Sequence, residues 1–394
     1  MDDLDYIPTS DMHFFEIKKD TDIVTITWRH NFFEDYKSLS YQFYECGCTT
    51  LNEVINSGHD NVKSDMWFLV GIFLIRHSIE LGLKALLCRT LKNREIENAF
   101  ESCHHNVYLL FCKYDTNGNE TYLSDEEKGW LTKYLCSLEE VDKNSDMFRF
   151  PFDDDFLSKY NDKFLDNIAV ANNLIQCFEL VRKCINKGVV DAGAVFNDKL
   201  TASFFVFTSH GIGNCYLLQK ISDNEFHTKL IGYTEVIDYI YNNQHISNAN
   251  KLYPLVFMFR NTIELYLKCL LYRTVNSGTV SNSKLKSHRI KKDLWRNVKP
   301  LILRYAQNFD QDLSIVNIVE NLLYEMDQLD KRGDKFRYPT SYSLDYYFDN
   351  KDFDVSNMYI VFKSIENFLS GCNSMLLEVE EFEAQMAAEI DSLE

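Results

Sequence analysis

The stretch RHSIELGLKALLCRT, residues 76–90, decides the fold, because a near copy of it, RNTIELYLKCLLYRT, recurs 184 residues later at residues 260–274. Ten of the fifteen paired positions are identical. Each copy predicts a helix that is apolar almost all round, and a helix of that kind is buried by other elements. We therefore expect two equivalent core helices in one chain.

The likeness continues downstream of both stretches. His104 corresponds to His288 at the same offset of 184. The segments DKNSDMFRFP (residues 142–151) and DKRGDKFRYP (residues 330–339) correspond at an offset of 188, which indicates a four-residue insertion in the second copy. Three blocks in the same order at nearly one spacing indicate an internal duplication.

The fold class expected is therefore mainly α, with two tandem helical bundles over residues 1–189 and 190–394. Proline is scarce, at 5 of 394 residues, which favours long helices. Helices are expected over residues 31–55, 64–91, 104–113, 125–141 and 162–187, and then over residues 248–275, 291–306, 310–329 and 355–389. Segments rich in β-branched and aromatic residues predict short strands before each bundle, at residues 22–28, 203–208 and 214–221. The last two are expected to form a hairpin or part of a small sheet.

Charge is distributed unevenly along the chain. The net charge of −18 argues against a general nucleic-acid coat or a binder of membrane surfaces, since both need an excess of Lys and Arg. Residues 284–299 are a local exception, with seven basic residues and one acid, Asp293. The C-terminal segment after Lys363 has eight acids and no basic residue, and it predicts an acidic helix. Each segment is either a solvated helix face or a surface for a partner.

The eleven cysteines lack recurring CxxC pairs, so we expect reduced thiols and no metal site. The N-terminal segment lacks the apolar core of a signal peptide, and the longest apolar run, residues 67–75, is half the length that a bilayer requires. We expect a cytoplasmic protein that does not enter a membrane. No Gly-rich phosphate loop, GxSxG or HExxH motif is present, and no cofactor is expected.

A polar ridge crosses each predicted core helix. Arg76, Glu80 and Lys84 are spaced four residues apart, so they stack along one helix face. Charges in a buried helix need partners. The ridge of the second copy consists of Arg260, Glu264 and Lys268. The partners expected for the two ridges are the other repeated polar residues: His104, Asp146 and Arg149 in the first copy, and His288, Asp334 and Arg337 in the second.

Two interpretations of the ridge remain open. In one, the charged pairs form an internal network that fixes the register of the helices. In the other, arginine, lysine and histidine side chains converge on a pocket for a phosphate or a nucleotide. His104 and His288 are the groups most expected to be accessible.

The pattern polar-x2-Glu-Leu-x-Leu-Lys-x-Leu-Leu, followed after a loop by His-x5-Leu, resembles the HEPN superfamily over residues 31–187 and 235–375. The resemblance implies bundles of four to five helices, of a kind found in toxin–antitoxin and antiviral defence systems and in CRISPR-linked ribonucleases. HEPN-like bundles pair with one another, so the resemblance also implies a pseudo-dimer within the chain and allows a homo-oligomer.

The resemblance implies a metal-independent endoribonuclease or an RNA- or nucleotide-binding protein. Arg76-His77 and Arg260-Asn261 match the first two positions of the ribonuclease motif, but Glu80-Leu81 and Glu264-Leu265 stand where its histidine is expected. Either the protein is a non-cleaving scaffold of a multi-protein defence complex, or two other histidines supply the general acid and base. In the second case the catalytic residues are Arg76, Arg260, His104 and His288, and the RNA-binding residues are Lys84, Arg149, Lys268 and Arg337.

Overall fold

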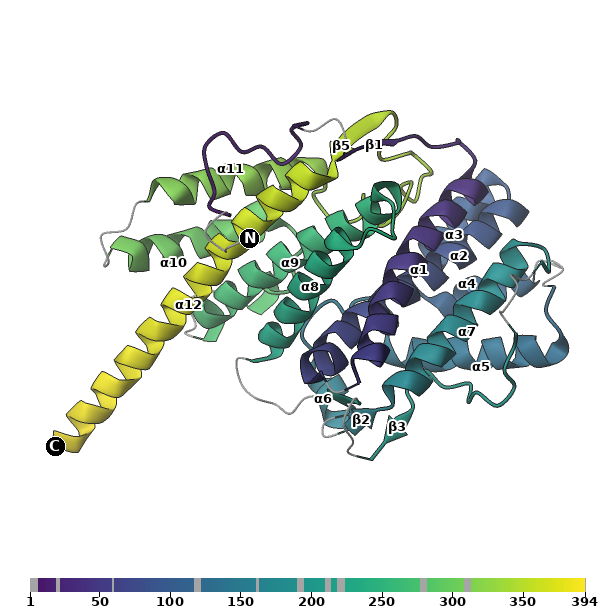
Figure 1. The fold of residues 1–394 in the computed structure, drawn as a ribbon, viewed down its shortest axis with the longest axis horizontal. Helices are drawn as coiled ribbons and strands as arrows, with labels where there is room; N and C mark the ends of the chain where they lie inside the picture. Colours follow the sequence, from purple (N-terminus) through teal and green to yellow (C-terminus); the bar gives the residue numbers. More distant parts are fainter. Residues whose placement is uncertain are drawn as a thin grey trace. The chain divides into compact units, whose positions relative to one another are not determined.

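The computed structural model describes residues 6–18, 22–58, 60–116, 122–160, 163–189, 195–209, 214–217, 224–276, 282–307 and 313–393. Over these residues the chain is mainly α-helical, as predicted, with a few short strands (Figure 1). The chain forms two compact units. Unit 1 comprises Met1–Val24, Phe259–Asp334 and Asp352–Glu394, and unit 2 comprises Thr25–Met258 and Lys335–Lys351.

Unit 2 is built round one buried helix, α2. This helix packs against α1, α4 and α7, which lie beside it in Figure 1. Every residue of α2 from Phe68 to Leu87 is buried, as the apolar pattern predicts. The helices of the unit are α1 (Phe32–Ser57), the π-helix η3 (Lys63–Trp67), α2 (Phe68–Thr90), α3 (Asn93–Cys103), α4 (Val107–Thr116), α5 (Asp125–Val141), α6 (Asp154–Tyr160), α7 (Asn167–Ile185) and α8 (Asn224–Asn242).

Two glycines allow α1 and α2 to pack closely. A Cβ atom on Gly47 would lie 2.6 Å from Cγ1 of Ile75, and one on Gly71 would lie 2.5 Å from Cδ2 of Leu51. Side chains larger than hydrogen at these positions would push the two helices apart. Helix α1 begins where the side chain of Asn31 accepts a hydrogen bond from the backbone of Glu34.

A small antiparallel sheet also belongs to unit 2. Its strands are β2 (Lys163–Leu165), β3 (Phe207–Thr208) and β4 (Cys215–Leu217), in the order β3-β2-β4. The small sheet expected from these segments is present, but a hairpin between the last two strands is wrong, because β2 lies between them. Strand β2 falls in the helix expected over residues 162–187, and α7 begins only after Asp166, whose side chain caps it.

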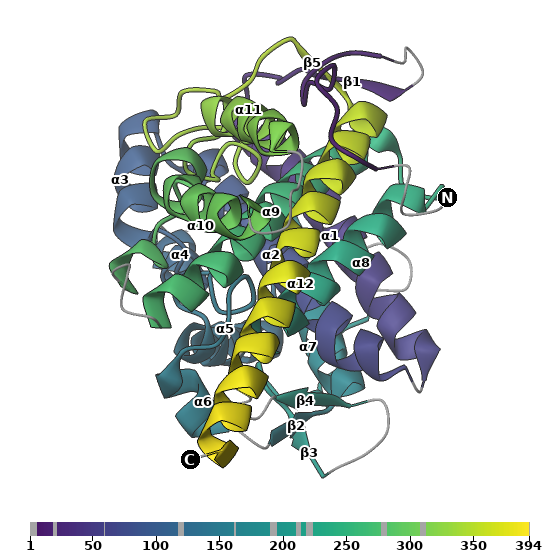
Figure 2. The same cartoon turned by 90° about the vertical axis from the view of Figure 1, so that its left-hand side faces the viewer.

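Unit 1 contains the helices that follow Met258 in the sequence. Helix α9 (Asn248–Asn276) contributes its residues from Phe259 onward, and the remaining helices are the 3₁₀-helix η4 (Asn282–Lys284), the π-helix η5 (Ile290–Trp295), α10 (Arg296–Gln307), α11 (Ser314–Leu329) and α12 (Val355–Leu393). Helix α12 runs on past α10 and α11 (Figures 1 and 2). Strands β1 (Ile23–Ile26) and β5 (Lys351–Asp354) pair in a two-stranded sheet.

The compact units differ from the expected division at residues 189 and 190. The N-terminal segment belongs to unit 1, since Phe14 is fully buried and its backbone N–H donates to Glu325. Helix α8 belongs to unit 2, where Trp67 of η3 donates its indole N–H to Glu235 at 2.6 Å. These contacts join residues that are far apart in the sequence, which the repeat pattern alone does not reveal.

Candidate functional site

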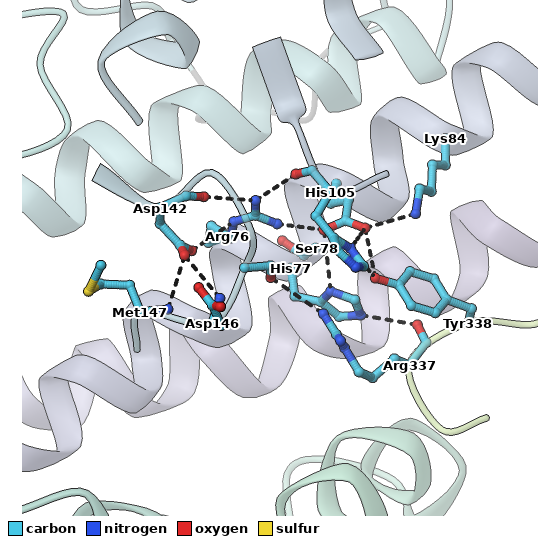
Figure 3. A network of polar contacts seen from close by, with 12 residues as sticks. Arg76, His77, Ser78, Lys84, His105, Asp142, Asp146, Met147, Arg337 and Tyr338 are labelled. Atoms are coloured by element: carbon cyan, nitrogen blue, oxygen red, sulfur yellow. Dashed lines mark hydrogen bonds and ion pairs between the residues drawn. The ribbon is translucent and has the colours of Figure 1, made fainter. Parts of the chain in front are cut away.

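The guanidinium group of Arg76 lies at the centre of a buried network in unit 2 (Figure 3). It donates to Glu80 at 2.5 Å, to the carbonyl oxygen of His105 at 2.6 Å and to the carbonyl oxygen of Asp142 at 3.2 Å. Its Nε atom forms an ion pair with the carboxylate of Asp142 at 3.1 Å. The side chain of Arg76 has no exposed surface. It therefore presents no face to a phosphate group.

Glu80 accepts contacts from three further side chains. The Lys84 ammonium lies 2.8 Å from its carboxylate, His105 Nδ1 lies 3.0 Å away, and the Tyr338 hydroxyl donates to it at 2.7 Å. Burial alone would raise the pKa of Glu80, but the positive charges of Lys84 and Arg76 and the bond from His105 hold that pKa well below its usual range. The carboxylate is thus charged and fully paired.

The partner Tyr338 comes from the second repeat, which the sequence did not predict. In unit 2 the segment around Arg337 and Tyr338 lies against α2 of the first repeat, and the Lys84 ammonium sits 4.2 Å from the centre of the Tyr338 ring. His77 Nε2 lies 3.0 Å from the carbonyl oxygen of Arg337. A loop of the second repeat therefore supplies contacts to Glu80, Lys84 and His77 on the core helix of the first repeat.

The histidine beside this ridge is His105, not His104. Helix α3 ends at Cys103. His104, which follows it, has a φ of 49° and turns the chain, so the next residue faces Glu80. The side chain of His104 is exposed and lies 3.5 Å from the hydroxyl group of Tyr342. The expected pairing of His104 with His288 is therefore wrong by one residue.

His105 is held by its neighbours. Its side chain is 24% exposed, and its Nδ1 atom lies 3.0 Å from the Glu80 carboxylate and 3.0 Å from the Tyr338 hydroxyl. Burial lowers the pKa of His105, and the nearby Glu80 carboxylate offsets only part of that shift. The ring is thus a partly exposed imidazole that a carboxylate orients.

Unit 1 repeats the contacts of the arginine, lysine and histidine at the corresponding positions. Arg260 donates to Glu264 at 2.8 Å, to the carbonyl oxygen of His288 at 2.6 Å and to the carbonyl oxygen of Asp330 at 3.1 Å. Lys268 and His288 Nδ1 each reach Glu264, at 2.7 Å and 2.8 Å. The His288 side chain is 46% exposed, about twice as much as that of His105.

The loop after each network also repeats. Asp142 accepts backbone N–H groups from Asp146 and Met147, and Asp330 accepts them from Gly333 and Asp334. Ser145 and Gly333, at the same offset of 188, both have a positive φ, of 60° and 81°. The first aspartate of each DKxxD segment is therefore the one that shapes the loop and contacts the arginine, whereas the sequence pattern predicts Asp146 and Asp334 as the partners.

All four residues predicted to bind RNA are buried. Arg149 and Arg337 are 6% and 3% exposed, and their guanidinium groups lie 5.3 Å and 5.8 Å from the ring centre of Phe257. Lys84 and Lys268 are 1% and 4% exposed and are paired with glutamates. Of the predicted site residues, only His104 and His288 are exposed.

In the basic segment of unit 1, residues 284–299, the single acid Asp293 binds several of the neighbouring side chains. Asp293 accepts from Lys284 at 2.9 Å, from Arg289 at 2.6 Å and from Ser287 at 2.7 Å. Burial would raise the pKa of Asp293, but these bonds lower it to about 2. Lys286, Lys292 and Arg296 are exposed along the same segment, which also contains His288.

An apolar groove lies in unit 1 between α10, α11 and α12. Its volume is about 910 Å³, and it is lined mainly by apolar side chains with two acids: Ile302, Val316, Phe368, Met375, Val379 and Phe382, with Glu378 and Glu383. Phe382 is 62% exposed. Large exposed apolar surfaces of this kind mark sites of interaction.

Two other features bear on partners and ligands. Among the residues that the structure describes, no group of three or more His, Cys, Asp or Glu side chains is placed to hold a metal ion.

Lys63–Thr90 is long and apolar enough to cross a membrane, but 94% of its apolar window is buried inside the protein. A buried core helix has the same composition, so this is weak evidence for a membrane span.

Comparison of the chain with protein families, with curated proteins and with solved structures finds no match.

Proposed function

We propose that the chain is a non-catalytic scaffold, which recruits a partner protein and does not cleave RNA. The observation that carries this proposal is the apolar groove of unit 1, where Phe382 is 62% exposed beside Met375 and Val379. Apolar side chains left in water at this scale are typical of protein-binding surfaces. The partner would belong to the kind of defence or toxin–antitoxin complex that the sequence resemblance implies.

The state of the two arginines supports the proposal. A catalytic arginine stabilises developing charge only where its guanidinium group meets the reacting phosphate. Arg76 is completely buried and Arg260 is 3% exposed, and each donates to a glutamate and to backbone carbonyl oxygens. In this interpretation the two ridges brace the helices on which they lie.

Replacing Phe382 with glutamate is expected to abolish binding of the partner and to leave the fold intact. The measurement is co-purification from the native host, identification of the protein that is captured, and titration of that purified protein against the chain. Phe207→Glu is the matched control, because Phe207 is an exposed aromatic of unit 2, at 44% exposure. The scaffold proposal fails if no partner depends on Phe382.

A second function is supported by a separate observation. His288 is 46% exposed, its Nδ1 is oriented by Glu264, and the exposed residues Lys292 and Arg296 follow on the same segment. A carboxylate that orients a surface imidazole is an arrangement used in general acid–base catalysis. This face of unit 1 would then bind RNA or a nucleotide through exposed cations, with His288 in place of the buried arginine as the reactive group.

A further inference from the structure

The outer part of α12 carries a continuous apolar stripe. Met375, Val379, Phe382, Met386 and Ile390 follow one another at steps of three or four residues, which places them on one face of the helix. From Met375 to Ile390 the stripe is roughly 22 Å long at 1.5 Å per residue. That length exceeds a small molecule and fits about four turns of a partner helix.

The outer half of the stripe is exposed in the part of the chain that the structure describes. Phe382, Met386 and Ile390 are 62%, 43% and 55% exposed, and no residue of α12 between Leu377 and Ile390 is buried. The groove continues the stripe inward, where Met375 and Val379 line it together with Ile302 of α10 and Val316 of α11. A helix that lies in this groove would cover both the inner and the outer part of the stripe.

The negative charge of α12 limits which molecules can bind in the groove. After Lys363 the chain has eight acids and no basic residue, and two of those acids, Glu378 and Glu383, line the groove. Pairing with α12 of a second copy would bring like charges together. Anionic lipid surfaces and nucleic acids would be repelled for the same reason.

The basic segment of a second copy is also a poor occupant. Its apolar residues Ile290, Leu294 and Trp295 are fully buried in their own unit. They therefore have no free apolar face to insert into the groove. The remaining occupant is a basic segment from a different protein.

We infer that the groove formed by α10, α11 and α12 binds an amphipathic basic helix of a partner protein. The apolar face of that helix contacts Met375, Val379 and Phe382, and its flanking Lys and Arg side chains contact Glu378 and Glu383. This is the helix-in-groove mode of recognition, in which apolar anchors supply affinity and flanking charges supply selectivity. The inference rests on the proposed scaffold function and names the chemical class of its partner.

The test uses the full chain and three labelled synthetic peptides of about twenty residues. The first has leucines at helical spacing flanked by Lys and Arg, the second has the same leucines flanked by Glu, and the third has the composition of the first in an order without a stripe. Fluorescence anisotropy is expected to show binding of the first peptide at least tenfold tighter than binding of the other two. The affinity is expected to fall as salt is raised from 50 to 500 mM, since screening weakens the charged contacts.

Two variants identify the binding surface. Phe382→Glu is expected to weaken binding of the basic peptide at least tenfold. The pair Glu378→Lys and Glu383→Lys is expected to reverse the preference, so that the acidic peptide binds more tightly. Both changes fall at partly or fully exposed positions of α12, and circular dichroism checks that the helix content is unchanged.

The inference is overturned if the peptide without a stripe binds as tightly as the first, since charge alone would then explain binding. It is also overturned if wild-type protein is a dimer that Phe382→Glu dissociates, because a second copy would then occupy the groove. If no peptide binds but a natural partner still depends on Phe382, the scaffold function stands and the basic helix is wrong. If no partner depends on Phe382 at all, the scaffold function itself fails.

Discussion

Replacing Glu80 with alanine is expected to lower the free energy of unfolding by roughly 3–5 kcal/mol, the usual cost of removing one partner from a buried ion pair. The substitution leaves Arg76 and Lys84 buried, with their shared carboxylate gone. It also removes the acceptor of the Tyr338 hydroxyl, which ties a loop of the second repeat to α2. Urea unfolding followed by circular dichroism measures the change.

The control for this substitution is Glu381→Ala, which removes an exposed carboxylate from α12 and should shift the unfolding free energy by less than about 0.5 kcal/mol. Glu264→Ala should resemble Glu80→Ala, because Glu264 holds Arg260 and Lys268 in the same way. An unfolding curve of Glu80→Ala that overlays the wild-type curve would show that the ridge does not brace the helices.

Replacing Lys229 with methionine is expected to stabilise the protein at pH 6 by roughly 3–5 kcal/mol, at about 1.4 kcal/mol for each unit of pKa shift. Lys229 is 3% exposed, and its ammonium lies 4.0 Å from the centre of the Phe152 ring, with the carbonyl oxygen of Met147 at 3.5 Å as a weak acceptor. Burial lowers the pKa of Lys229 to about 7, with partial compensation from Cys215 and Asp142. A charged amine in these surroundings is destabilising.

The pH dependence of this effect has a definite sign. Below pH 7 Lys229 is protonated in both the folded and the unfolded chain, so the full penalty is present. Between pH 7 and the ordinary pKa of 10.5 the unfolded chain binds more protons, so the stability of the wild type rises with pH relative to the variant. The advantage of Lys229→Met should therefore shrink by about 2 kcal/mol from pH 6 to pH 8.5.

Lys133→Met is the matched control for Lys229→Met, because Lys133 is exposed on α5. It should give a small difference from the wild type that does not vary between pH 6 and pH 8.5. If the gain in unfolding free energy from Lys229→Met did not change between pH 6 and pH 8.5, the amine of Lys229 would be charged over that whole range. The gain would then come from better packing of methionine and not from the lowered pKa of Lys229.

The sequence predicted the helical elements well where a long periodic pattern dominates. The core helix expected over residues 64–91 is η3 and α2 together, and the acidic helix expected over residues 355–389 is α12. The internal likeness predicted two charged ridges, and both are present with the same contacts at Arg76 and Arg260. Residue type and spacing are sufficient for these features, because they depend on local periodicity.

The features that were not predicted depend on backbone turns or on contacts between distant residues. The choice of His105 over His104 follows from the positive φ of His104, which the residue type does not reveal. The hydrogen bond from Tyr338 to Glu80 joins residues 258 positions apart. Strand β2 is three residues long, too short to show a period of its own, and it is paired by segments more than forty residues away.

The central claim is that the two charged ridges brace the fold and do not catalyse RNA cleavage. The most direct test is incubation of purified wild-type protein with labelled single-stranded and structured RNA, alongside the double variant His105→Ala and His288→Ala. The account predicts no cleavage by either protein above the rate without protein. Cleavage by the wild type that falls about 10²–10⁴-fold in a folded double variant would contradict it and would make the two histidines a general acid and base.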